Sequence, residues 1–128
     1  YIKKLYFKDP LFSNTKIYYT VFDNSFNGDL NNLLSEKLLF ENLQNNDVKM
    51  IDEPTFENLN RFAISNSDAV VQGSKKLDKN ILNYILKNRI PLLKKTGGGN
   101  FEEKCLYFYE NDSKLEEAKK KSELVEVV

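Results

Sequence analysis

The chain has 128 residues, of which 19 are Lys or Arg, 19 are Asp or Glu and none is His, so its formal net charge is zero. This balance gives no electrostatic basis for binding nucleic acid or an anionic membrane, and the lack of histidine excludes Ser-His-Asp catalysis and histidine-bound zinc within the chain. A single cysteine, 41% hydrophobic residues and no membrane-spanning apolar run predict a folded, cytoplasmic chain without an internal disulfide.

The first half of the chain is predicted to place one strand among helices. Ile2, Leu5 and Tyr6 fall on one helical face, as in the last turns of a helix that Pro10 would end. Because this pattern starts at the first residue without a cap, we expect the chain to be part of a longer protein. The elements predicted up to residue 66 are a helix end at 1–8, a strand at 15–22, a polar loop at 23–29, a helix at 30–43, a connector at 44–53 and a helix at 55–66.

The second half alternates strands and helices. The segment DAVVQGS, residues 68–74, is a short apolar run bounded by turn formers, which is typical of an interior parallel strand. The elements that follow are a helix at 77–88, a strand at 90–95, a helix at 101–109 and a charged helix or tail at 112–128. This order predicts an α/β fold, a three-layer Rossmann-like parallel sheet, with one domain over residues 1–111.

Ligands of an open parallel sheet bind beyond the carboxyl ends of its strands, where this chain has three turns. In KKTGGG, residues 94–99, the lysines precede the glycines and no phosphate-loop spacing is present, so we favour a simple strand-to-helix turn with Asn100 as the helix cap. In QGSKK, residues 72–76, Ser74 either caps the next helix or binds an anion, and capping is the favoured reading.

The loop DNSFNGD, residues 23–29, is the third turn. Its polar groups around Gly28 could hydrogen-bond sugar hydroxyl groups while Phe26 offers a stacking surface, although an ordinary asparagine-rich turn is the simpler reading. Cys105, on an aromatic-rich helix, is interpreted as a small core residue rather than a nucleophile. Asp68, just before a strand, is interpreted as a turn or cap residue.

Two segments resemble motifs of one enzyme family. The stretch NLNRFAISNSDAVVQGS, residues 58–74, is similar to a segment of bacterial glycogen and plant starch synthases, and YYTVFDNSFNG, residues 18–28, resembles the strand end and loop that precede it in that family. The similarity extends over about residues 1–110 and is closest to short, divergent glycogen synthase-like proteins of Bacteroidetes-type bacteria. The matching positions are Thr20, Val21, Phe26, Gly28, Asn58, Ile64, Asp68, Val70 and Ser74, with Arg61 keeping a positive charge.

The resemblance implies a GT-B glycosyltransferase, of which this chain would be the second half of the N-terminal, acceptor-side domain. Such enzymes transfer glucose from ADP-glucose or UDP-glucose to an α-1,4-glucan without an essential metal or other cofactor. The implied partners are therefore a glucan and a nucleotide sugar, with no nucleic acid and no membrane. By itself the chain is expected to be inactive, with no catalytic residue of its own. The implied substrate-binding residues are Asp23, Asn24, Gly28, Asn58, Arg61 and Ser74.

The sequence also departs from that family. The family histidine over the donor sugar aligns with Phe22, which cannot donate a hydrogen bond, and KKTGGG lies at the wrong end of the domain to be the family's donor loop. A degenerate, noncatalytic glucan-binding or regulatory domain is therefore an alternative, and a plain Rossmann-like interaction module is a third reading. The synthase reading requires the turns after residues 22 and 71 to lie at one edge of a parallel sheet.

Overall fold

The computed structural model describes residues 1–39, 42–95 and 100–111 and divides into two compact units. The helical unit is formed by Tyr1–Ile17 and Ser25–Ser67. The sheet unit is formed by Tyr18–Asn24 and the described part of Asp68–Val128. The predicted tail at 112–128 and the glycines of KKTGGG lie outside the described residues.

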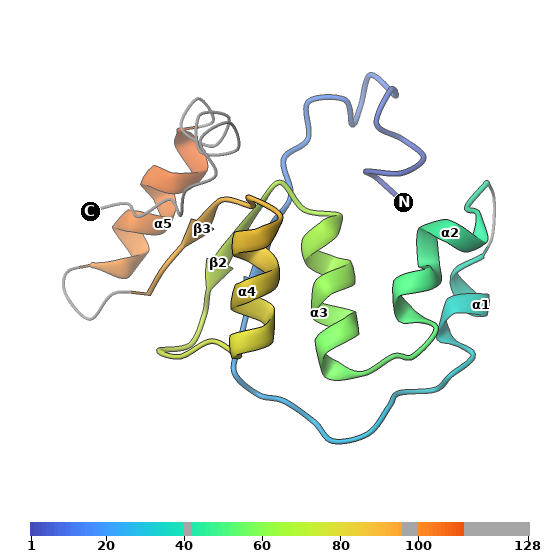
Figure 1. The fold of residues 1–128 in the computed structure, drawn as a ribbon. Helices are drawn as coiled ribbons and strands as arrows, with labels where there is room; N and C mark the ends of the chain where they lie inside the picture. Colours follow the sequence, from blue (N-terminus) through green and yellow to red (C-terminus); the bar gives the residue numbers. More distant parts are fainter. Residues whose placement is uncertain (40–41, 96–99, 112–128) are drawn as a thin grey trace. The chain divides into compact units, whose positions relative to one another are not determined.

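The sheet unit contains a three-stranded parallel sheet (Figure 1), as the alternation of strands and helices predicts. The strands β1 (Tyr18–Val21), β2 (Ala69–Gln72) and β3 (Leu92–Leu93) follow one another in that order. Tyr18 pairs with Ala69, and Val71 with Leu93. The α/β class is thus confirmed, although the strands are shorter than the predicted runs.

The central strand of the sheet, β2, is covered on both faces. Every residue of β2 is buried, in agreement with a reading as an interior strand. On one face Ala69, Val71 and Leu93 pack against Phe108 of α5 (Phe101–Glu110). The opposite face carries the fully buried Val70 and Leu92. Helix α4 (Lys79–Lys87) connects β2 to β3 as the crossover that parallel strands require (Figure 1). Its Ile81 and Ile85 are completely buried.

The helical unit contains one regular helix and several short ones. Its elements are α1 (Leu34–Leu38), α2 (Asn45–Val48), the 3₁₀ turn η1 (Lys49–Ile51) and α3 (Phe56–Ser65). Helix α3 begins as predicted, because the Thr55 hydroxyl oxygen accepts a hydrogen bond from the Asn58 amide at 3.1 Å. The first residues are tied to this unit by the Tyr1 hydroxyl, which donates to the Leu38 carbonyl at 2.7 Å.

Three predictions for the helical unit were wrong. Residues 1–8 form turns rather than a helix, since so short a segment gains too few hydrogen bonds to offset nucleation. The predicted helix at 30–43 is reduced to the five residues of α1, because Leu30 donates its amide to the Pro54 carbonyl at 3.0 Å and the next residues form a turn. Residues 40 and 41 of that helix lie outside the described residues. The connector at 44–53 contains α2 and η1, which a reciprocal cap between Gln44 and Asp47 starts.

None of the described helices has the length and apolar character needed to cross a membrane.

Candidate functional site at the carboxyl edge of the sheet

The turns that follow β1 and β2 are joined by hydrogen bonds. The Gly73 amide donates to the Val21 carbonyl at 2.8 Å, which extends the parallel pairing beyond the strands. The Asp23 amide then donates to the Ser74 hydroxyl oxygen at 2.8 Å. The expectation that these two turns share one edge of a parallel sheet is therefore confirmed. We refer to this place as the carboxyl edge.

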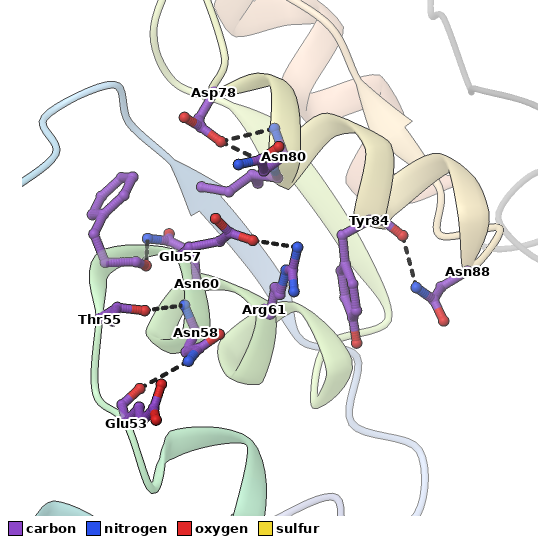
Figure 2. A network of polar contacts seen from close by, with 12 residues as sticks. Glu53, Thr55, Glu57, Asn58, Asn60, Arg61, Asp78, Asn80, Tyr84 and Asn88 are labelled. Atoms are coloured by element: carbon purple, nitrogen blue, oxygen red, sulfur yellow. Dashed lines mark hydrogen bonds and ion pairs between the residues drawn. The ribbon is translucent and has the colours of Figure 1, made fainter. Parts of the chain in front are cut away.

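Ser74 does not cap the helix that follows it, contrary to the favoured sequence reading. Asp78 takes that role, and its carboxylate accepts from the amides of Asn80 at 2.9 Å and Ile81 at 3.1 Å (Figure 2). Ser74 lies too far before the first turn of α4 to reach these amides. Its hydroxyl instead accepts the hydrogen bond from the Asp23 amide, in the turn after β1. The Gln72 side chain fixes the turn further by donating to the Ser74 carbonyl at 2.8 Å.

Phe22 lies across the carboxyl edge with its ring against Gly73. A Cβ atom placed on Gly73 would lie only 2.6 Å from the ring, so this approach requires glycine or a displaced ring. The Phe22 side chain is nevertheless 52% exposed. Phe22 thus presents an apolar ring to its surroundings. The side chains of Asp23 and Asn24 beside it are exposed as well.

A cavity of about 590 Å³ opens between the carboxyl edge and α5. Within it, the Lys95 ammonium group donates to the Gly73 carbonyl at 3.3 Å and lies 5.3 Å from the centre of the Phe101 ring. The strands and their turns contribute Thr20, Phe22, Val71, Gly73 and Lys95 to its walls. Helix α5 contributes Phe101, Glu102, Cys105, Leu106 and Tyr109.

Helix α5 starts where the sequence predicts. The Asn100 side chain accepts from the amides of Glu102 at 3.1 Å and Glu103 at 3.4 Å, which confirms it as the cap. Cys105, one turn later, packs against the apolar cluster around Val71. Burial raises the pKa of the Cys105 thiol, and the hydrogen bond with Tyr109 lowers it by less. A protonated thiol is a poor nucleophile, which agrees with the interpretation as a core residue.

The other predicted binding residues belong to the helical unit and are engaged in its local structure. Gly28 has a φ of 78°, which explains a glycine in this loop. The Asn58 side chain donates to the Glu53 carbonyl at 2.9 Å, next to the start of α3 (Figure 2). Arg61 forms an ion pair with Glu57 one turn before it. Phe26, suggested as a stacking surface, already packs edge-on against Phe56, with ring centres 5.7 Å apart.

The structure thus brings Asp23, Asn24 and Ser74 to one edge and leaves Gly28, Asn58 and Arg61 in separate local roles. The sequence reading missed the cavity walls. Thr20 and Phe22, or Val71 and Gly73, have the spacing of two that places side chains on one face of a strand, and this was the available signal. Within the described ranges, no group of three Asp, Glu or Cys side chains gathers in a way that could hold a metal ion.

No protein-family model matches the chain, and neither a curated protein nor a solved structure resembles it significantly.

Proposed function

We propose that the chain is part of a glycosyltransferase of the glycogen and starch synthase type. In this proposal it forms half of the acceptor-side domain of a cytoplasmic GT-B enzyme that transfers glucose from ADP-glucose or UDP-glucose to an α-1,4-glucan. The support is the resemblance of residues 18–28 and 58–74 to the family motifs, together with a parallel sheet that follows the order of these motifs. The observation that carries it is the 2.8 Å hydrogen bond from the Asp23 amide to Ser74, which joins the two motifs at one edge.

The exposed polar side chains at this edge have a defined task in the proposal. Asp23 accepts and Asn24 both donates and accepts hydrogen bonds, so the pair suits the hydroxyl groups of a sugar. The hydrogen bond to Ser74 holds the backbone from which they project. Phe22 supplies no donor for the developing charge of the reaction, so the chain positions substrate and leaves the chemistry to groups elsewhere in the full-length protein.

The test is transfer by the full-length protein that contains this chain. Radiolabelled ADP-glucose and UDP-glucose are supplied separately with glycogen, and label in the polymer is counted. We expect incorporation from one donor, and an Asp23→Ala/Asn24→Ala variant should lose at least about 1 kcal/mol of transition-state binding in kcat/KM. An Asn88→Ala variant serves as the control, since it removes an exposed Asn that follows α4 and bonds only to the Tyr84 carbonyl of that helix. A protein that neither binds nor extends glucan with any nucleotide sugar contradicts the proposal.

A second candidate function is that of a noncatalytic glucan-binding or regulatory domain. The observation that favours it is the Phe22 ring against Gly73, in the place of the family histidine. Phe22→His and Phe7→His make a matched pair, because both phenylalanines are 52% exposed. Transfer that appears only with Phe22→His would indicate a decayed enzyme. The noncatalytic domain would be supported if the protein binds glucan, if nucleotide sugars do not change that binding, and if no variant shows turnover.

A further inference from the structure

The cavity between the carboxyl edge and α5 has the size of a binding site for a small molecule. Its volume of about 590 Å³ falls within the usual range for ligand pockets, roughly 300–1,000 Å³. Its position also fits, since ligands of parallel α/β sheets bind outside the carboxyl ends of the strands. The residues that the glucan proposal uses, Asp23, Asn24 and Ser74, do not line it. The cavity therefore needs an explanation of its own.

The walls of the cavity suit a flat, mostly apolar body. Three large apolar or aromatic side chains in these walls are exposed: Phe22 by 52%, Leu106 by 58% and Tyr109 by 40%. Apolar side chains that are exposed together in one hollow often mark a binding site. The close approach of Phe22 to Gly73 sets one ring at the end of β2. Aromatic rings gain most from stacked or edge-on contacts with other rings, so these walls favour a planar ring over a flexible aliphatic chain.

The charged groups of the cavity indicate a ligand without net charge. The only charged side chains in its walls, among the described residues, are Lys95 and Glu102, and their formal charges cancel. Lys95 is held in place by the Gly73 carbonyl and the Phe101 ring, and its ammonium group has three donors. Glu102 offers only acceptors when ionised, and the Thr20 hydroxyl group can do either. Such a set satisfies hydroxyl and amide groups better than a phosphate.

We propose that the cavity binds a nucleoside, with its heteroaromatic base against Phe22, Leu106 and Tyr109 and its ribose hydroxyl groups hydrogen-bonded to Glu102. A carboxylate that accepts from ribose hydroxyl groups is common in nucleotide-binding α/β proteins. Lys95 donates to a carbonyl or ring nitrogen of the base or to the 5′-oxygen. This site goes beyond the proposed glucan transfer and does not depend on it.

Cys105 provides a direct readout, because it is the only cysteine in the chain and lines the cavity. The 128-residue chain is treated with N-ethylmaleimide at about pH 7.5, where maleimides react with the thiolate much faster than with lysine amines. The rate is measured by mass spectrometry with and without adenosine, uridine, AMP or maltotriose, in the absence of any glucan. The ratio of the two rates reports occupancy and cancels any effect of a substitution on the thiol itself.

We expect adenosine or uridine to slow alkylation by about fivefold or more at saturation. Leu106→Asp, which replaces an apolar wall with a charge where the base would lie, should weaken protection at least about tenfold, and Glu102→Gln should raise the apparent Kd about tenfold. The controls are Leu86→Asp on α4 and Glu103→Gln beside Glu102, neither of which lines the cavity. Circular dichroism checks that each variant is folded.

Three results would overturn the proposal. The first is a folded chain in which neither nucleoside slows alkylation of Cys105. The second is protection that is unchanged in Leu106→Asp, which would place the ligand elsewhere. The third is protection by maltotriose or AMP but not by nucleosides, which would assign the cavity to a sugar or to an anion. Glucan transfer is measured separately, on the full-length protein with nucleotide sugars, so a failure here is distinguishable from a failure of the proposed function.

Discussion

The two units use the residues of a single sequence motif in different ways. In the helical unit, Asn58 and Arg61 bond within or beside α3, to Glu53 and Glu57, and contribute to a helix start. In the sheet unit, Ser74 bonds across strands to the Asp23 amide. The segment 58–74 therefore has two parts: the first stabilises α3, and the second forms the carboxyl edge of the sheet. Functional tests are best directed at the edge.

Each unit also has a hollow in its surface, and the two hollows differ in the polarity of their walls. The helical unit has one of about 460 Å³ whose walls are mainly polar and come from the short helices α1 and α2 and their surroundings. The sheet unit has the more apolar hollow, held between a buried sheet and a ten-residue helix. Sites built on rigid elements keep their geometry better than sites on short, loosely supported ones. This favours the carboxyl edge as the functional region.

The largest expected effect tests whether the sheet unit is the rigid frame that this comparison assumes. Ile85→Ala removes a fully buried side chain from α4 and should lower the free energy of unfolding by about 2–5 kcal/mol. Leu86→Ala, at the neighbouring position, is the matched control. We expect it to lower the free energy of unfolding much less, because the Leu86 side chain is 39% exposed. Urea denaturation followed by circular dichroism measures both. Equal losses would show that the sheet unit lacks a packed core.

The two helix caps permit a comparison of the units under the same chemical change. Thr55→Ala removes the cap of α3 in the helical unit, and Asp78→Ala removes the cap of α4 in the sheet unit. Each should cost about 1 kcal/mol, since amides at the helix start lose their acceptor. Hydrogen exchange at Asn58 in the first variant and at Ile81 in the second locates the loss. Exchange that changes at neither amide would contradict the assigned caps.

Ser74→Ala tests the bond that joins the two turns. The Asp23 amide would lose its acceptor, at a cost of about 0.5–1.5 kcal/mol, which corresponds to exchange about 2–12 times faster at that amide. Ser65→Ala is the control, because the Ser65 hydroxyl bonds only locally, donating to the Phe62 carbonyl and accepting from the Asn66 side chain at 3.3 Å. An unchanged exchange rate at Asp23 in Ser74→Ala would remove the main support for the proposed function.

The smallest effect concerns alkaline pH. Burial raises the pKa of Tyr19 in β1 above its usual value of 10.0. The folded chain therefore holds this proton more tightly than the unfolded chain, so the associated stability is present below about pH 10 and is lost as pH rises through the higher folded value. Tyr19→Phe should flatten the fall in stability above about pH 10 relative to the wild type. Parallel denaturation curves for both proteins across this range would contradict the assignment.

The sequence by itself determined the alternation of elements in the sheet unit. The aromatic and β-branched run at 18–21 and the apolar run at 69–72 identify strands, and the capping residue Asn100 locates a helix start, because both signals act over a few neighbouring residues. It also determined that histidine chemistry is absent from the chain. The same local rules failed at the start of 30–43, where a long-range hydrogen bond from Leu30 to Pro54 and a turn stand in place of the first helical turn, and the helix is reduced to α1.

Only the tertiary structure decided the role of Ser74 and the existence of the cavity. A serine two residues after a strand has the same local signal whether it caps a helix or accepts a bond from a residue 51 positions away. The cavity requires that Phe22, Lys95 and Tyr109 come together from two strand ends and a helix, which no local pattern encodes. Parallel pairing brings distant strand ends to one edge, and the composition of that edge is therefore a property of the fold rather than of any single segment.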